Sequence, residues 1–140
     1  MPIKYTIHND GHFIHAIACG IVTDKDIIDY EATHNSDERI KTPADELFEI
    51  QPGAFQEVTR DGISKVLEHK KESKEPIPHR CGIVVSYGNH IAWDLAKYYE
   101  TMVTEHSPRS VIVFGDAGIA RKWLGVEKIK AEQVAPEDGS

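Results

Sequence analysis

The alternation of apolar and polar side chains predicts two strands at the start of the chain. Over residues 3–8 every second side chain is apolar, which is the period of a half-buried strand. Asn9-Asp10-Gly11 follows, and an Asp-Gly pair between two strands is typical of a hairpin turn. Residues 12–19 then alternate again. We therefore expect the first two strands to form an antiparallel hairpin.

The pattern over residues 81–103 predicts one complete strand–turn–helix unit. Residues 81–85 form a short apolar run rich in β-branched side chains, as in strands that are covered on both faces. The next four residues, Ser86-Tyr87-Gly88-Asn89, are common in turns and helix caps. From His90 to about Glu105 apolar side chains recur with the period of a helix. Ile91 and Leu95 fall on its expected buried face, and Leu95 should be central to it.

Two threonines mark the starts of further helices. Thr23 and Thr59 suit the N-cap position, because a hydroxyl there accepts a hydrogen bond from a free backbone amide. We expect helices from Thr23 to about Asn35 and from Thr59 to about Lys71, although a longer second helix that includes Phe55 fits the pattern as well. A last short helix should stop at a glycine. The remaining elements are strands at residues 46–50 and 110–114 and a helix that ends at Gly125.

Together these elements predict a single α/β domain with a five-stranded mixed sheet and four main helices. The sheet should be mostly parallel, with an antiparallel N-terminal hairpin. A chain of 140 residues is within the usual size of one domain. We expect the domain to span residues 1–125. Residues 126–140 are polar and acidic, and we expect a flexible tail there.

Charge and cysteine content narrow the possible partners and the compartment. The formal charge of −7 argues against a nucleic-acid partner or an anionic membrane surface. No apolar run approaches the length of a membrane span, and the N-terminus lacks a secretory apolar region. Cys19 and Cys81 lie inside expected strands, so we expect buried, reduced thiols. These observations favour a cytoplasmic protein.

The residues that could carry catalysis or hold a cofactor do not form a recognisable motif. Among the eight histidines, His12 and His15 fall on opposite faces of a strand, and His8 and His12 lack a third ligand. Ser86 follows a strand, but a nucleophile elbow would need glycine where Val84 stands. No glycine-rich phosphate loop occurs. We expect no metal, no cofactor and no catalytic residue.

The carboxyl ends of the parallel strands are the predicted binding site, because ligands of open α/β sheets gather there. The helix that starts at His90 would offer free amide groups to an anion or a polar ligand. Trp93 lies off the apolar face and could line such a site or a subunit contact. A purely structural turn is the alternative interpretation. The candidate ligand- or partner-binding residues are Gln51, Ser86, Tyr87, Asn89, His90, Trp93 and Asp116.

Several segments carry a resemblance to a known family. They are Gly20-Ile21-Val22-Thr23, then Ile83-Val84-Val85-Ser86 followed by Ala92, Leu95, Ala96 and Tyr99, and finally Val113-Phe114 followed by Ala120 and Trp123-Leu124-Gly125. With the order of elements, they resemble the SpoIIAA-like group of STAS domains, the fold of bacterial anti-sigma-factor antagonists. The resemblance covers residues 3–125. The closing strand, helix and Trp-Leu-Gly segment is most similar to the uncharacterised STAS-like proteins of that group.

The chain departs from the family at the position of its phosphorylation switch. In the switching members, a phosphorylated serine in an Asp-Ser-Ser/Thr-Gly context opens the helix after the third strand. The matching segment here is Gln51-Pro52-Gly53-Ala54-Phe55-Gln56, and the nearest hydroxyl belongs to Thr59. The usual phosphorylatable serine motif is therefore missing.

Two functions from different classes remain open. The resemblance implies a non-enzymatic binding or regulatory module that acts through protein–protein contact, with a homodimer as one form of it. The alternative is a protein that binds a small polar or anionic molecule, or an unrecognised enzyme, with the cleft at the strand ends near Ser86 and His90 as its site.

Overall fold

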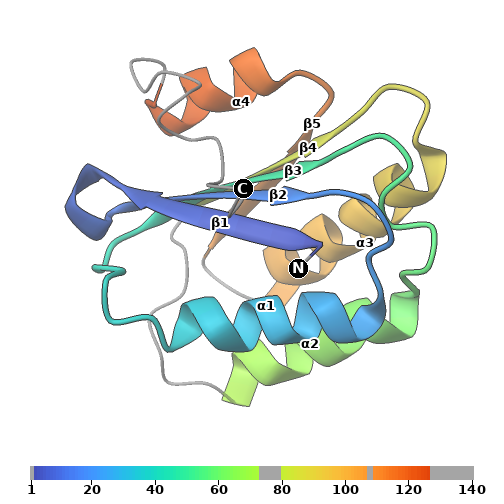
Figure 1. Cartoon of the computed structure of the whole chain (residues 1–140), viewed down its shortest axis with the longest axis horizontal. Coiled ribbons are helices and arrows are strands. Elements are labelled where there is room, and N and C mark those ends of the chain that lie inside the picture. Colours follow the sequence, from blue (N-terminus) through green and yellow to red (C-terminus); the bar gives the residue numbers. More distant parts are fainter. Residues whose placement is uncertain (1, 73–79, 107–108, 127–140) are drawn as a thin grey trace.

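Five strands form one mixed sheet in the order β1-β2-β3-β4-β5 (Figure 1). The computed structural model describes residues 2–72, 80–106 and 109–126. β1 and β2 are antiparallel, and every other neighbouring pair is parallel, which confirms the predicted α/β fold. The strands are β1 (Ile3–His8), β2 (Phe13–Ala18), β3 (Asp45–Ile50), β4 (Arg80–Val85) and β5 (Ser110–Phe114).

The hairpin between β1 and β2 turns through a short 3₁₀ segment, η1 (Asn9–Gly11). Asn9, Asp10 and Gly11 all have positive φ angles, a conformation that asparagine, aspartate and glycine tolerate best. A Cβ atom on Gly11 would lie 2.4 Å from the backbone oxygen of Arg39, so the turn also requires glycine for space. The Asp-Gly signal in the sequence was therefore correct for two separate reasons.

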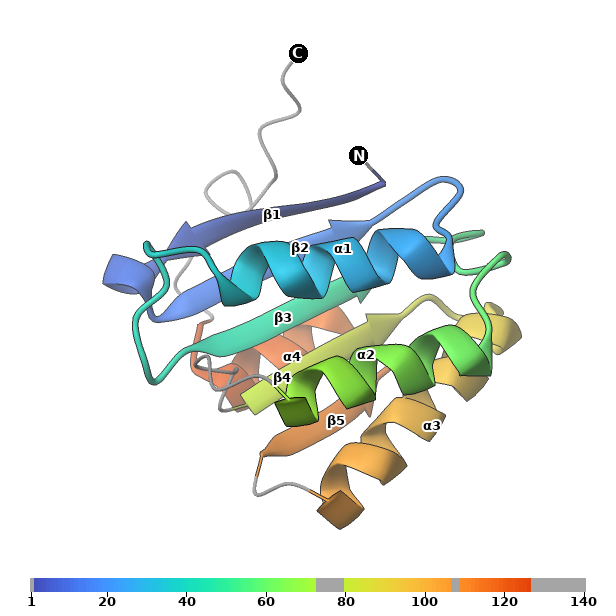
Figure 2. The ribbon, with the colours of Figure 1, turned by 90° about the horizontal axis from the view of Figure 1, so that it is seen from below.

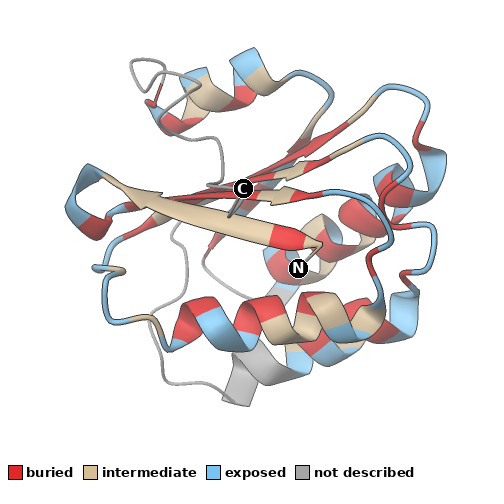
Figure 3. Cartoon of the chain, in the orientation of Figure 1, coloured by how far each residue is buried: buried red, intermediate tan, exposed pale blue. Residues whose placement is uncertain are grey.

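The four helices of the described residues cover the sheet unequally. α1, α2 and α3 lie on one face, and α4 lies on the other (Figures 1 and 2). The larger hydrophobic core lies under the three helices, and a smaller one lies under α4. Figure 3 shows the buried sides of the helices turned toward the sheet. The helices are α1 (Asp24–Asn35), α2 (Arg60–Glu72), α3 (His90–His106) and α4 (Ala117–Leu124).

The helix ends follow the capping chemistry of the sequence. Thr23 forms a reciprocal capping box with Asp26, and the hydroxyl of Thr59 accepts a hydrogen bond from the Gly62 amide at 3.1 Å. Gly125 ends α4 with a left-handed φ of 73°. The longer second helix is wrong, because Phe55 has a φ of 74° and α2 begins at Arg60.

The larger core contains the residue that the sequence placed at its centre. Leu95 is buried among residues of β3, β4 and α2, as the helical period of α3 predicts. Ile91 has the same period but is 45% exposed, because the buried face of α3 is centred on Ala92, Ala96, Tyr99 and Val103 and Ile91 lies at its margin. Cys81 is buried, whereas Cys19 is exposed.

The exposure of Cys19 corrects the prediction that both thiols are buried. β2 ends at Ala18, so Cys19 is the first residue of the following loop and has left the sheet. Both cysteines are free thiols. In the described parts of the chain, no helix combines the length and the apolar content that crossing a membrane requires.

Two predicted segments lie largely outside the described residues. One is a linker that Pro76 and Pro78 predict over residues 72–79, of which Glu72 ends α2 and residues 73–79 are not described. The other is the acidic tail, of which residues 127–140 are not described. Val126, which we assigned to the tail, is buried in the smaller core beneath α4.

Candidate functional site

The four loops that follow the parallel strands lie along one edge of the sheet, which we call the carboxyl edge. It consists of residues 19–23, 51–59, 86–89 and 115–116 together with the first turns of α1 to α4 (Figure 1). All seven candidate residues predicted from the sequence belong to it. Their side chains, however, serve different purposes.

Three of the candidates have polar side chains that hold the loops in place. The hydroxyl of Ser86 donates to the backbone oxygen of Ile50 at 3.2 Å. Asn89 is buried, and its amide nitrogen donates to the backbone oxygen of Ala54 at 3.1 Å while its side-chain oxygen accepts from the Ala92 amide. Asp116 caps α4 by accepting from the Ile119 amide at 3.1 Å. These contacts are those of structural turns.

Three of the other four candidates are exposed to solvent, as residues of a contact surface would be. Tyr87 is fully exposed, Trp93 is 40% exposed, and His90 is also exposed. Within the described residues, none of these three side chains makes a hydrogen bond. Gln51 is half-buried, and its backbone amide donates to the Ala18 oxygen at 2.9 Å, which ties the β3 loop to β2.

Exposed apolar side chains gather at the carboxyl edge. Among the described residues, six large apolar side chains are exposed, and five of them follow the end of a strand. Scattered exposed side chains are normal, but such a concentration at one edge marks a candidate contact surface. The sixth, Ile112, lies within β5. We call the five residues the apolar rim: Ile21, Tyr87, Ile91, Trp93 and Ile119.

Sequence reasoning missed three members of the apolar rim. Ile21 lies in the loop before α1, and Ile119 lies in the first turn of α4, outside the side of that helix that the pattern marks as buried. Ile91 was assigned to the buried face of α3, because the helical period alone does not show how wide that buried face is.

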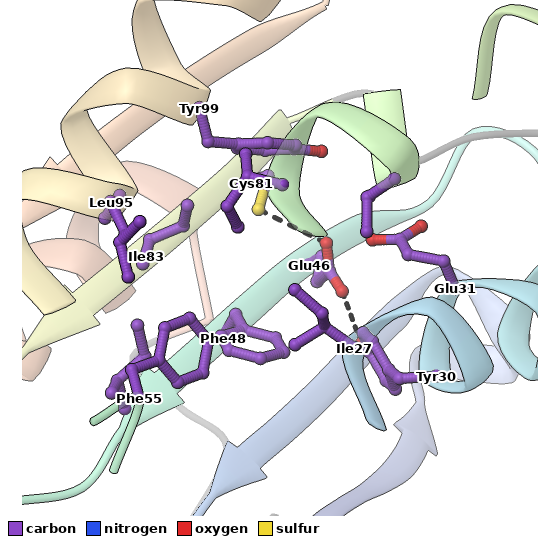
Figure 4. Close-up of a pocket in the computed structure, with 14 residues that line it drawn as sticks. Ile27, Tyr30, Glu31, Glu46, Phe48, Phe55, Cys81, Ile83, Leu95 and Tyr99 are labelled. Carbon is purple, nitrogen blue, oxygen red and sulfur yellow. Dashed lines mark hydrogen bonds between the residues drawn. The ribbon is translucent and has the colours of Figure 1, made fainter. Parts of the chain in front are cut away.

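A second candidate site is an internal cavity of about 60 Å³ between the sheet and helices α1, α2 and α3. Fourteen residues line it, and none is among the seven candidates predicted from the sequence. Phe48, Phe55, Ile83 and Leu95 form an apolar end (Figure 4). The polar residues of the lining gather at the other end (Figure 4), and they are Tyr30, Glu31, Glu46, Cys81 and Tyr99.

Glu46 is the centre of the polar end of the cavity. One carboxylate oxygen accepts a hydrogen bond from the Cys81 thiol at 3.2 Å, and the other accepts from the Tyr30 hydroxyl. Burial raises the pKa of Tyr30 well above its usual value, and the negative charge of Glu46 raises it further. Tyr30 therefore remains a neutral hydrogen-bond donor.

Two further buried contacts complete this polar end. The carboxylate of Glu31 pairs with the His34 ring at 3.0 Å, and both side chains are almost fully buried. The Arg109 guanidinium donates to the Tyr99 hydroxyl at 3.1 Å. This cluster leaves no local pattern in the sequence, since its members come from α1, β3, β4, α3 and the residue before β5.

A larger pocket near the hairpin turn has a structural explanation for its charged residues. Its volume is about 490 Å³, and Asp45 and Arg80 lie in its lining. Arg80 pairs with Asp45 at 2.6 Å and donates to the backbone oxygens of Trp123 and Leu124. The guanidinium thus fastens the end of α4 to β3 and β4. In the described part of the chain, no three potential metal ligands lie close enough to hold an ion.

The fold and the two candidate sites define an α/β protein with a mixed sheet, an apolar rim and a partly polar internal cavity. Comparisons of this chain with protein-family models, with curated proteins and with solved structures find no match.

Proposed function

We propose that this protein is a non-enzymatic, STAS-like binding or regulatory module that acts through contact with a protein partner at the carboxyl edge. The observation that carries the proposal is the apolar rim, in which five exposed apolar side chains follow the ends of the strands. Tyrosine and tryptophan are enriched at protein interfaces, because their rings bury a large area while keeping a polar group.

The polar chemistry of the same edge supports a contact surface rather than a small-molecule site. Ser86, Asn89 and Asp116 already use their side chains to hold loops and cap helices. The outward side chains are mainly apolar, and Tyr87 is fully exposed. A protein with a matching apolar patch would remove this area from water, which is favourable at roughly 25 cal/mol per Å².

The net charge and the free thiols indicate which partners and which compartment we expect for this module. The charge of −7 opposes binding to nucleic acid. Free thiols at Cys19 and Cys81 fit the reducing cytoplasm. The regulation we propose does not use a phosphorylated serine after β3, because the segment from Gln51 to Gln56 contains no hydroxyl side chain.

Site-specific photo-crosslinking in the cells that make the protein tests the proposal. A photoreactive amino acid at position 87 should capture one defined protein, which mass spectrometry then identifies. The matched control carries the same group at position 112, an exposed apolar site outside the apolar rim. Capture of a second copy of the chain would identify a homodimer. Equal capture of the same proteins from positions 87 and 112 would contradict the proposal.

A further inference from the structure

The carboxyl edge carries more than half of the net charge of the chain. Its loops and first helical turns, together with Asp94 at the next position of α3, contain six carboxylates and two cations, a formal balance of −4 against −7 for all 140 residues. An acidic surface attracts a basic partner and repels an acidic one. The carboxylates are those of Asp24, Asp26, Glu57, Asp61, Asp94 and Asp116, and the cations are Lys25 and Arg60.

Both cations of this edge already have partners. Lys25 pairs with Asp29 at 2.7 Å, and the Arg60 guanidinium lies 4.9 Å from the centre of the Tyr98 ring. Within the described residues, Asp61 is the one carboxylate of the six that forms an ion pair. The negative charge of the other five is therefore available to a basic partner.

These carboxylates lie beside the apolar side chains of the rim. Each isoleucine of the apolar rim has an aspartate three positions away in the sequence. Ile91 and Asp94 share α3, where residues three apart are neighbours on the helix surface. Asp116 accepts a hydrogen bond from the Ile119 amide at 3.1 Å. The three pairs are Ile21 with Asp24, Ile91 with Asp94 and Ile119 with Asp116.

A second copy of the chain is disfavoured as the occupant of this edge. Two copies that met here would bring two acidic surfaces together at distances shorter than the Debye length of about 8 Å, where like charges repel. Nucleic acid and anionic lipid carry the same sign of charge and are disfavoured for the same reason. The charge favours a different protein, with basic side chains next to apolar ones.

The dimensions of the apolar rim favour a helix as the element that binds it. The rim follows the loops from β2 to β5, and at about 4.8 Å between neighbouring strands it is roughly 14 Å long. An extended chain of that length has about four residues and turns about two side chains to one side. A helix of that length has about ten residues and presents about three or four apolar side chains in one stripe. The helix is therefore the better match to the five exposed side chains.

We propose that the partner at the carboxyl edge presents a basic amphipathic helix. Its apolar residues pack on the apolar rim, and its lysine or arginine side chains face Glu57, Asp94 and Asp116. This inference rests on the proposed function, because it names the chemistry of the partner that binds the same surface. Apolar burial supplies most of the affinity, and the charges select the partner and speed its association.

Three synthetic peptides of about 18 residues, long enough to form helices, test the inference on the unaltered protein. They share one leucine stripe and differ in their polar positions, which are all lysine, all glutamine or all glutamate. The lysine peptide should bind at least tenfold more tightly than the glutamine peptide, and the glutamate peptide more weakly than both. Fluorescence anisotropy measures the affinities. Nuclear magnetic resonance should show that the lysine peptide shifts the amides of Tyr87, Ile91 and Asp94.

The failure of this inference differs from the failure of the proposed function. Equal affinity of the lysine and glutamine peptides for the rim overturns the basic partner but leaves the rim as a contact surface. Capture of a second copy of the chain at position 87 does the same. Lysine-peptide shifts outside the carboxyl edge, or no binding of any peptide, overturn the inference, and the crosslink at position 87 then decides the proposed function by itself.

Two double variants separate the charge of this edge from the net charge of the chain. Glu57→Gln/Asp94→Asn removes two charges beside the rim and should weaken binding of the lysine peptide at least fivefold. Asp10→Asn/Glu68→Gln is the matched control, since both carboxylates are exposed and lie outside the carboxyl edge, and it should stay within twofold of the unaltered protein. Circular dichroism establishes that each variant is folded. Unchanged affinity in the first variant, or equal losses in both, overturns the inference, and the peptide series on the unaltered protein decides it if a variant does not fold.

Discussion

Thr59 shows how one side chain joins two helices of this protein. Its backbone amide and its hydroxyl both donate to the Asp24 carboxylate, at 2.8 and 2.6 Å, while the same hydroxyl oxygen accepts from the Gly62 amide. Asp24 begins α1 and Thr59 caps α2, so this contact links the starts of the two helices. Gly62 packs so closely that a Cβ atom there would lie 2.3 Å from the Asp24 side chain.

Replacing Thr59 should therefore loosen α2. We expect Thr59→Ala to lower the free energy of unfolding by about 1 kcal/mol, because the cap is lost. Thr59→Ser keeps the hydroxyl and should lose much less. Urea denaturation measures both variants, and equal losses for alanine and serine would show that the hydroxyl does not matter.

The same contacts predict that Thr59 is not a phosphorylation switch. A phosphate on this oxygen would bring about −1.5 to −2 charges next to the Asp24 carboxylate and break the cap. Mass spectrometry of the protein from its own cells should find Thr59 unmodified. Substantial phosphorylation there, together with a phosphomimetic variant that loses its partner, would restore the sigma-factor type of regulation.

Tyr5 should make stability depend on alkaline pH. Its hydroxyl donates to Asp37 at 2.7 Å, and burial, followed by this hydrogen bond, raises its pKa from 10.0 to about 12. The unfolded side chain ionises first, so its contribution is complete below pH 10 and is lost as the pH rises toward 12. The stability advantage of the unaltered protein over Tyr5→Phe should shrink across this window in denaturant melts. A constant difference would contradict the raised pKa.

The two thiols should react at different rates. Cys19 is exposed in the loop after β2, whereas Cys81 is buried beside Glu46. In the native protein a thiol reagent should modify one cysteine rapidly, and the second only after denaturation. Mass spectrometry of the labelled peptides identifies which one reacted. Rapid labelling of both, or no free thiol after denaturation, is the contrary result.

At the residue scale, local chemistry was predictable and tertiary environment was not. Thr23 and Thr59 were recognised as caps, because the interactions of an N-cap lie within three residues. The bond from Thr59 to Asp24 spans 35 positions and leaves no local pattern. The alternation of apolar and polar residues extends to Cys19, but β2 ends one residue earlier, at Ala18, and Cys19 is therefore exposed.

At the element scale, α3 shows both the strength and the limit of periodicity. The buried residues of α3 repeat at helical spacing, so the helix and its inner face could be predicted from the sequence. The period does not show how wide the buried face is, which is why Ile91, at its margin, was misassigned. The cavity was missed for a related reason, since Glu31 and Glu46 meet only when α1 packs beside β3.

Leu95 tests the packing of α3 on the sheet. Leu95→Ala removes buried methyl groups and leaves a void, so we expect the free energy of unfolding to fall by about 2–5 kcal/mol. Thr101→Ala, on the exposed side of the same helix, should change it by less than about 0.5 kcal/mol. A loss below about 1 kcal/mol for Leu95→Ala would show that α3 is rotated from the described position.

At the scale of the whole molecule, the two ends of the parallel strands have different chemistry. The amino ends contain the buried polar cluster around Glu46, and the carboxyl ends contain the apolar rim. The order of the strands could not be predicted from the pattern of apolar residues, since that pattern does not show which strands lie side by side. The rim could be predicted only in part, since it collects single side chains from separate loops and first helical turns.

The most direct test of the central claim is the affinity for the protein that position 87 captures. We expect the double variant Tyr87→Ala/Ile91→Ala to bind it at least tenfold more weakly, because two rim side chains are truncated. Ile112→Ala, which truncates the exposed apolar side chain outside the rim, should bind as the unaltered protein does. Calorimetric titration of each folded variant gives the result. If the double variant retains full affinity, or if Ile112→Ala loses as much, the carboxyl edge is not the surface through which this protein acts.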